Sequence, residues 1–176
     1  MEFNQLVIKK IVPLFKGFNF IVVEKYKNYF RFRSKVVEAT ISYNELDRTC
    51  LFEVGKINEF LYPLNDNLIK HVFGLDVKVN QVTKDVFVDN IALLLKNSGS
   101  DLLRGDESKL FEIKIFSEKE SEAYTSQILQ EQNLAAANKA WENGSYKEFI
   151  KIIDQLNKDK LPSSYQLKYK IANQKI

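Results

Sequence analysis

Few residues in this sequence have side chains suited to catalysis or metal binding, and those few are isolated. His71 is the only histidine and Cys50 the only cysteine among 176 residues. A metal site usually needs several His, Cys or carboxylate ligands. Asp66 and Asp76 lie near His71 in sequence, but their spacing matches no known ligand set. A nucleophilic cysteine normally needs a histidine base, and Cys50 alternates with core-type apolar residues. We therefore predict no enzymatic activity, no metal and no cofactor.

Carboxylates and glycines give the same result. The stretch SEKESEAY contains Glu118, Glu120 and Glu122, and on a helix Glu118 and Glu122 share one face, which is typical of a solvated surface. The six glycines are scattered, and none forms a Gly-rich run that would cradle a phosphate. A hydrolase is the third alternative. It would require catalytic carboxylates that are not paired in the sequence and that only the fold would bring together.

The tripeptide Arg104-Gly-Asp106 has two interpretations. As an adhesion motif it would need an exported protein and an exposed loop. As a local backbone feature it is the connection between two helices, where Gly105 allows a sharp bend and Asp106 caps the free N–H groups of the next helix. Because helix stop and start signals surround the tripeptide, we predict the cap.

Composition indicates an ordinary globular protein, with 45% hydrophobic and 28% charged residues. The net charge of +3 is too weak to indicate nucleic acid. A single cysteine favours a reducing compartment. No apolar run reaches the roughly 20 residues of a membrane span, and the start, Met1-Glu2-Phe3, lacks the pattern of a secretory signal. We expect a cytoplasmic protein that does not bind membranes.

The first predicted element is a helix over residues 3–15. Pro13 should distort the end of this helix, and Gly17 should stop it. From residue 18 to 54 the hydrophobic period changes to two, which predicts an antiparallel meander of about four strands. Turns at 27–28, 34–35 and 44–47 would pair Val23 with Phe32, Phe32 with Val37, and Ile41 with Cys50. All three turns put the same apolar residues on one face.

The opposite, outer face of this meander is the candidate site. The predicted registers place Glu24, Arg31, Glu38 and Glu53 in one transverse row. Beside that row lie Tyr26, Tyr29, Thr40 and Leu51, and Phe20, Val22 and Arg33 share the face. Tyrosine and arginine on an open sheet indicate a surface for another protein, whereas a stacking platform for single-stranded RNA is less suited to its glutamates. The alternative is a plain solvent-exposed or helix-covered face. The predicted partner-binding residues are Glu24, Tyr26, Tyr29, Arg31, Glu38, Leu51 and Glu53.

The remainder of the chain is mainly helical. Residues 58–73 have a helical pattern broken by Pro63, and residues 77–79 fit a short strand. Thr83 is a predicted N-cap of a helix that Gly99 ends. A longer helix then runs from Asp106 towards Ala140, with a strand over residues 110–116 as the alternative.

Two more helices, joined at residues 143–145 and followed by a third after Pro162, close the chain. Through Ala140, Trp141, Gly144, Tyr146 and Leu161-Pro162 this stretch resembles one tetratricopeptide-type helical hairpin. A lone unit makes no solenoid. We expect an α+β domain over residues 1–134 with a helical hairpin over 135–176 packed on it, or a single domain over 1–176, and Trp141 packed against Tyr146 and Phe149.

The order of the elements also resembles small bacterial α+β immunity proteins of contact-dependent toxin systems. The stretches that carry this resemblance are LFKGFNFIVVEKY, YFRFRSKVVEATISYNE and IALLLKNSGSDLLRGD. It implies a non-enzymatic inhibitor that occludes a toxin with a basic surface. The alternative is an intracellular adaptor that acts through its C-terminal hairpin.

Overall fold

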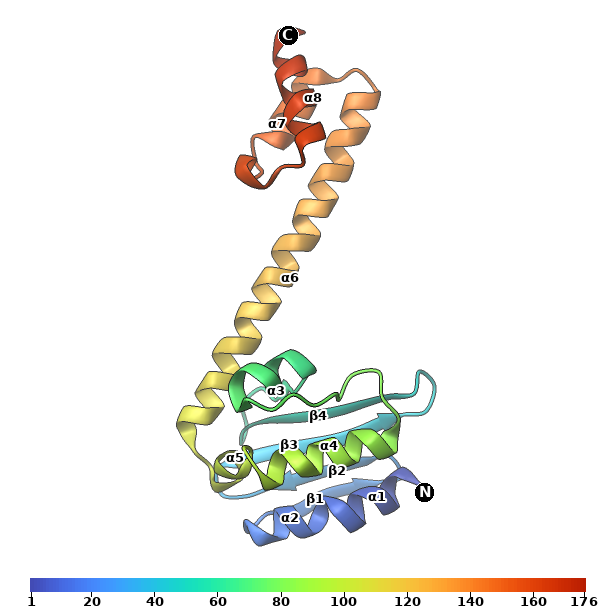
Figure 1. The fold of residues 1–176 in the computed structure, drawn as a ribbon, viewed down its shortest axis with the longest axis vertical. Coiled ribbons are helices and arrows are strands. Elements are labelled where there is room, and N and C mark those ends of the chain that lie inside the picture. Colours follow the sequence, from blue (N-terminus) through green and yellow to red (C-terminus); the bar gives the residue numbers. More distant parts are fainter. The chain divides into compact units, whose positions relative to one another are not determined.

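The computed structural model describes the backbone of residues 1–176 and all side chains except that of Lys160. The chain forms two compact units, Met1–Glu118 and Lys119–Ile176 (Figure 1). The first contains an antiparallel sheet with helices, and the second is helical. The predicted α+β class is therefore confirmed.

The N-terminal helical segment is two helices, α1 (Phe3–Lys10) and α2 (Val12–Gly17), where the sequence suggested one. The break falls at Ile11 because Pro13, in the first turn of α2, has no N–H to donate to the preceding turn. The apolar residues at helical spacing nevertheless face the core: Phe3, Leu6, Val7, Ile11 and Phe15 are buried, and Leu14 is partly buried.

The predicted meander is confirmed as a five-stranded antiparallel sheet with strand order β1-β2-β3-β4-β5 (Figure 1). Its strands are β1 (Ile21–Tyr26), β2 (Tyr29–Arg33), β3 (Val37–Asn44), β4 (Thr49–Lys56) and the short β5 (Tyr62–Pro63). The inner face is apolar because alternate residues of each strand point into the core. These inner residues include Phe30, Phe32, Ala39, Ile41, Phe52 and Val54.

The first hairpin follows the predicted turn only near its tip. Tyr26 lies opposite Tyr29 and Glu24 opposite Arg31, as a turn at residues 27–28 requires. Beyond them the register shifts between Val22 and Glu24, so that Val22, not Val23, lies opposite Phe32. An extra residue in one strand is a β-bulge, which no hydrophobic pattern reveals in advance.

The other two hairpins are each displaced by two residues from the prediction. Phe32 lies opposite Ala39 and Ile41 opposite Phe52. The Ser34 hydroxyl accepts a hydrogen bond from the Val37 N–H (3.0 Å), which closes a longer loop than the predicted two-residue turn. Because side chains alternate with period two, a shift of two leaves the same residues facing inward.

Helices α3 (Asp66–Phe73) and α4 (Lys84–Lys96) complete the core of the first unit. Two expectations are corrected here, and a third is confirmed. Only residues 66–73 of the segment 58–73 are helical, because Tyr62 and Pro63 pair with β4. Residues 77–79 form no strand; the Val79 N–H is instead bound by the Asp66 carboxylate at 2.7 Å. Thr83 does cap α4 as predicted, with its side chain accepting from the Val86 N–H.

The tripeptide at residues 104–106 is a helix joint. Helix α5 (Ser100–Arg104), which the sequence did not predict separately, ends at Gly105, whose φ of 83° lies in the left-handed region. Helix α6 (Glu107–Glu142) follows without the alternative strand at 110–116. The Asp106 carboxylate accepts from the Ser108 N–H (2.8 Å) and hydroxyl (2.6 Å), which confirms the cap.

The second unit contains the C-terminal part of α6, α7 (Tyr146–Ile153), a 3₁₀ turn at Lys158–Lys160 and α8 (Ser163–Gln174). Its small core includes Ala137, Phe149, Ile153 and Ala172. The Trp141 ring packs edge-on against the rings of Tyr146 and Phe149, with centroids 5.3 and 5.4 Å away, as predicted. Gly144, at φ 70°, makes the turn between α6 and α7.

Candidate functional site

The outer face of the sheet is defined by three transverse rows that cross its strands. One row is Glu24–Arg31–Thr40–Glu53, the next is Arg33–Glu38–Gly55, and the third is Tyr26–Tyr29–Ser42–Leu51. All seven predicted partner-binding residues belong to these rows, so the structure brings them onto one face.

Four positions on this face differ from the prediction. The two-residue displacement of β3 moves Glu38 out of the first row and brings Thr40 into it. The bulge in β1 turns Val22 to the side of Phe32. Phe20 is buried and packs edge-on against Phe15, with ring centroids 4.8 Å apart. Neither Phe20 nor Val22 therefore belongs to the outer face.

Glu38 is the centre of the charged part of the outer face, and it is only 2% exposed. Its Oε1 accepts from Arg31 Nε at 2.7 Å and also from Arg31 Nη2. Its Oε2 accepts from Arg33 Nε at 2.8 Å and from Arg33 Nη2 at 2.6 Å. Each guanidinium thus holds one carboxylate oxygen through two charge-assisted N–H···O bonds, so both oxygens of Glu38 are occupied.

The two arginines decide the ionisation of Glu38. Burial would raise the pKa of its carboxyl group, but the hydrogen bonds and positive charges of Arg31 and Arg33 outweigh burial and lower that pKa below its ordinary value. The same contacts raise the pKa of Arg31, so both partners stay charged. The cluster is therefore an ordered network of paired charges in which both arginines are bound to Glu38.

Two further acidic residues flank this cluster. Glu24 Oε1 accepts from Arg31 Nη1 at a longer 3.3 Å, and the buried Thr40 hydroxyl donates to Glu53 Oε2 at 2.8 Å. Neither carboxylate is neutralised as completely as Glu38. Because Glu24, Glu38 and Glu53 outnumber Arg31 and Arg33, the three rows carry a small net negative charge.

The third row supplies apolar surface beside the charges. Tyr26 is 65% exposed and Leu51 41% exposed, although both are large hydrophobic residues. The Tyr26 and Tyr29 rings lie 6.0 Å apart between centroids. Burial, followed by the charge of Glu24, raises the pKa of Tyr29, so its hydroxyl stays protonated at neutral pH and can donate a hydrogen bond.

Sequence reasoning missed the importance of Arg33 and Thr40. It recognised Arg33 only as a member of the face, whereas Arg33 supplies half of the hydrogen bonds to Glu38. The spacing Arg31-x-Arg33 could have indicated this role, because it puts two guanidiniums on the same side of one strand. The predicted register concealed the role, because it placed Glu38 opposite Arg31 alone.

The isolated reactive residues have no reactive neighbours. His71 stacks on Phe116 with centroids 5.1 Å apart, and its Nδ1 lies 2.8 Å from the Asn67 carbonyl oxygen. Burial raises the pKa of the Cys50 thiol to about 11, which leaves it protonated. Within the described side chains, no group of three or more His, Cys, Asp or Glu residues is placed to hold a metal.

No helix in the described part of the chain is both long and apolar enough to cross a membrane. Comparisons with protein-family models, with curated proteins and with solved structures found no match to this chain.

Proposed function

We propose that the protein is a non-enzymatic binding module that recognises another protein through the outer face of its sheet. The observation that carries this proposal is the exposure of Tyr26 and Leu51 beside the ordered cluster around Glu38. Tyrosine is enriched at the centres of protein interfaces because it buries a large area and still satisfies its hydroxyl. The cluster is ordered before binding, so complex formation costs little side-chain entropy there.

A basic surface on the partner suits the charge of this face. Glu24 and Glu53 flank the cluster around Glu38 and are the carboxylates available to an incoming lysine or arginine. Complementary charges of this kind set specificity and speed association. A toxin with a basic active site meets this requirement, so an immunity-type inhibitor acting in the cytoplasm is the specific form of the proposal.

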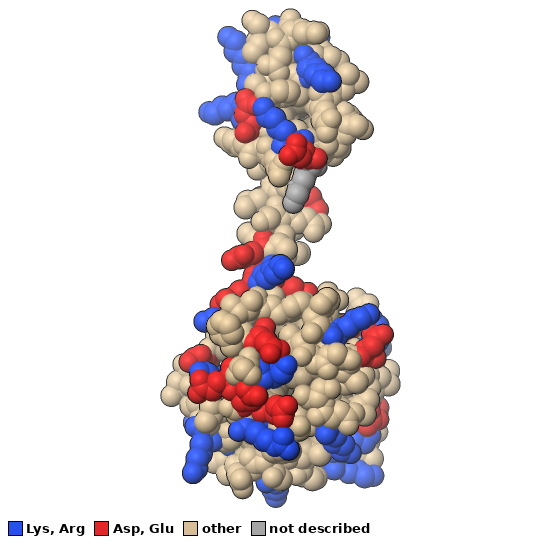
Figure 2. All heavy atoms as spheres, turned by 60° about the vertical axis from the view of Figure 1, so that its left-hand side comes forward, with Lys and Arg blue, Asp and Glu red and all other residues tan. Residues whose placement is uncertain are grey.

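Nucleic acid fits the same face less well. Its two arginines are already bound to Glu38, and its remaining charges are negative, whereas a phosphate backbone needs unneutralised cations. On the face shown in Figure 2, basic and acidic side chains are interspersed over the unit that contains the sheet, so no broad basic surface appears there either.

The experiment compares partner recovery by the wild type with recovery by a Tyr26→Ala/Leu51→Ala double variant in a pull-down from the source cells. The identified partner is then titrated against both proteins. We expect the double variant to bind at least about 30-fold more weakly, which corresponds to about 2 kcal/mol for hot-spot residues. Leu46→Ala is the matched control, because Leu46 is 96% exposed and lies outside the three rows.

Equal binding by the double variant and the wild type, with both proteins folded, would refute the outer face as the binding site. If binding instead depends on Leu167, which is exposed on α8, the adaptor alternative through the C-terminal unit replaces the proposal.

A further inference from the structure

The edge of β4 that faces away from β3 is only partly paired. β3 pairs with β4 along its whole length from Thr49 to Lys56, but β5 pairs only with Glu53 and Val54. One more bond continues the ladder, from the Leu64 N–H to the Phe52 carbonyl at 2.9 Å. The chain then enters α3, so among the described residues no strand lies beside 49–51 on this edge.

The backbone of Cys50 points at this unpaired edge. The Phe52 carbonyl is directed away from β3, since it accepts from Leu64. Residues two apart along a strand direct their N–H and C=O groups to the same side. The N–H and C=O of Cys50 are therefore directed away from β3 as well, which is the arrangement that accepts an added strand.

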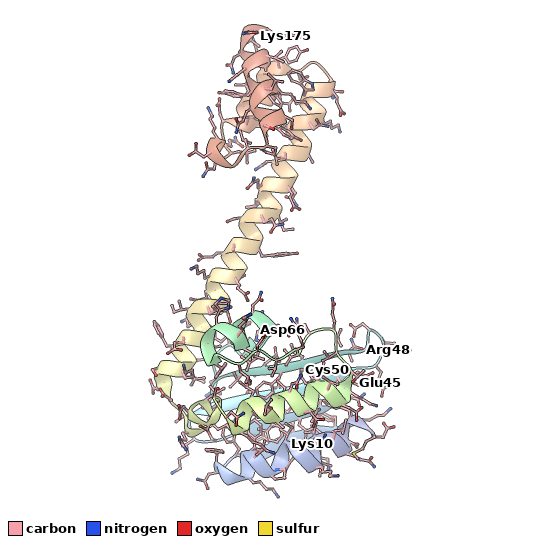
Figure 3. All side chains as sticks on the ribbon, in the orientation of Figure 1. Lys10, Glu45, Arg48, Cys50, Asp66 and Lys175 are labelled. Atoms are coloured by element: carbon pink, nitrogen blue, oxygen red, sulfur yellow. The ribbon has the colours of Figure 1, made fainter. Side chains whose placement is uncertain are left out.

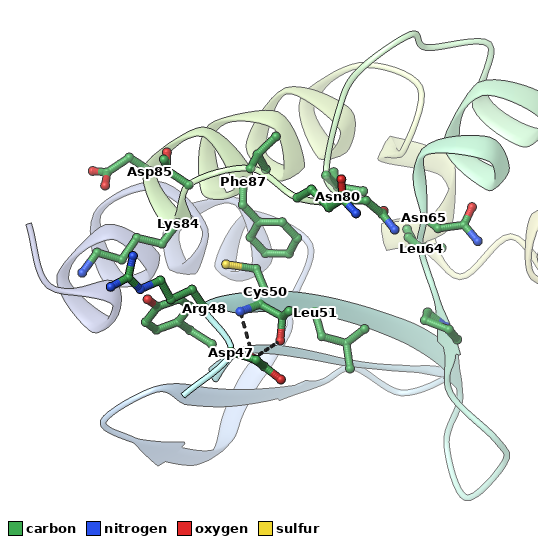
Figure 4. A pocket seen from close by; sticks show the side chains of 17 residues that line it. Asp47, Arg48, Cys50, Leu51, Leu64, Asn65, Asn80, Lys84, Asp85 and Phe87 are labelled. Carbon is green, nitrogen blue, oxygen red and sulfur yellow. Dashed lines mark hydrogen bonds between the residues drawn. The ribbon is translucent and has the colours of Figure 1, made fainter. Parts of the chain in front are cut away.

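A cleft of 940 Å³ lies along the edge at this position (Figure 4). One wall is residues 49–51 of β4, and the other is the segment 79–85, with Leu64 and Phe87 among the apolar lining residues. The second wall is pinned by Asp66, in the first turn of α3 (Figure 3), which accepts from the N–H groups of Val79 (2.7 Å) and Asn80 (2.9 Å).

Two cations lie at one end of the cleft. Figure 4 shows Arg48 and Lys84 at the end that is remote from Leu64 and Asn65. Within the described side chains, neither has a carboxylate within ion-pair distance; Lys84 Nζ lies over the Tyr43 ring at 5.6 Å. The carboxylates that also line the cleft are Asp85 and Asp47, and Asp47 is engaged by the Thr49 N–H and hydroxyl.

We propose that this cleft binds the C-terminal segment of another protein as an added strand beside β4. β5 runs antiparallel to β4, so a peptide that continues the line of β5 runs towards Arg48 and Lys84 and presents its terminal carboxylate there. Its backbone pairs with the N–H and C=O of Cys50. The side chain opposite Cys50 points to the same side as that thiol, towards Phe87, so it is apolar.

This site shares only Leu51 with the outer face proposed above, since it uses a strand edge and two cations that lie outside the three rows. It recognises a class of ligand defined by its chemistry: an extended chain, an apolar side chain near the end and a free carboxyl terminus.

The test uses the full chain and a pool of randomised hexapeptides with free carboxyl ends, fluorescein-labelled at their N-termini. The same pool with amidated ends is the ligand control. Retention of each pool on the immobilised protein is measured, and retained peptides are sequenced. We expect retention of the free-carboxylate pool to exceed that of the amidated pool by about tenfold, since a hydrogen bond to a charged group contributes about 1.5 kcal/mol.

The variant is Arg48→Asn/Lys84→Gln, because Asn tolerates the φ of 57° found at position 48. It should lose the preference for free carboxylates. Lys16→Gln/Lys96→Gln, which removes two exposed cations elsewhere in the first unit, should keep it. A retained peptide should also slow hydrogen exchange at the Cys50 amide.

Three outcomes overturn the proposal. One is retention of neither pool, and another is equal retention of both. The third is a Cys50 amide already protected in the wild type without peptide, because a second copy of the chain would then occupy the edge.

Discussion

Replacing Glu38 with alanine tests whether the cluster on the outer face stabilises the fold. Removing one partner of a fully buried ion pair costs about 3–5 kcal/mol, since the other charge is left without compensation. Here the arginine side chains are 31% and 37% exposed, so both can regain water when the carboxylate is lost. Allowing for that rehydration, we expect Glu38→Ala to lower the free energy of unfolding by about 2 kcal/mol.

The effect should also depend on pH, and the pKa of Glu38 fixes the sign. Its folded-state pKa lies below the unfolded value, which is about 4.3 for a free glutamate. The stability it contributes is therefore present above about pH 4.3 and is lost as the pH falls through the lower folded-state value. The difference between wild type and Glu38→Ala should shrink between pH 7 and pH 2.5.

Urea unfolding of both proteins at the two pH values measures this difference directly. Glu24→Ala is the control, because its single 3.3 Å contact to Arg31 is partly exposed and should change stability by less than about 0.5 kcal/mol. A loss below about 0.5 kcal/mol for Glu38→Ala at pH 7, or an equal loss at pH 2.5, would refute the assignment of a stabilising role to the ionised carboxylate.

Three more outcomes are expected. Asp106→Ala should lower the thermal unfolding midpoint by a few degrees through loss of the cap, whereas Arg104→Ala should leave it unchanged; two unchanged midpoints would contradict the cap. Trp141 fluorescence should be protected from acrylamide in the native state, and full accessibility would show that the ring is not packed as described. Gly55→Ala should cost about 2 kcal/mol in urea unfolding, because the new Cβ would lie 2.5 Å from the Phe60 carbonyl oxygen; a neutral result would mean that this loop yields freely.

The inward set of β2, β3 and β4 was predictable from the sequence, because the face to which a side chain points depends only on whether its position in the strand is odd or even. Displacements of two residues at both later hairpins left Phe32, Ile41 and Phe52 inside. Which residues lie opposite one another depends on loop length, and that is set by local hydrogen bonds such as those of Ser34 and Asp47. Hydrophobic spacing carries no information about these bonds.

The members of the outer face were therefore predicted, but not which of them lie opposite one another. Tyr26, Tyr29 and Leu51 lie in one row as expected, because the turn at residues 27–28 was placed correctly and the equal displacements on the two sides of β3 cancel. The pairing of Glu38 with two arginines was not foreseen, since it depends on the true register of β3. The open edge at Cys50 was not foreseen either, because it results from how early β5 ends.

The bulge at Val23 has a consequence for how the molecule behaves at high concentration. β1 forms one edge of the sheet, and Ile21, Val22 and Val23 are all exposed there. A regular apolar edge is a template on which copies of a chain stack into fibrils. The extra residue interrupts the ladder and increases the local twist, and Lys25 adds a charge that repels a second copy. The irregularity in β1 thus makes this edge of the sheet a poor template for a second copy.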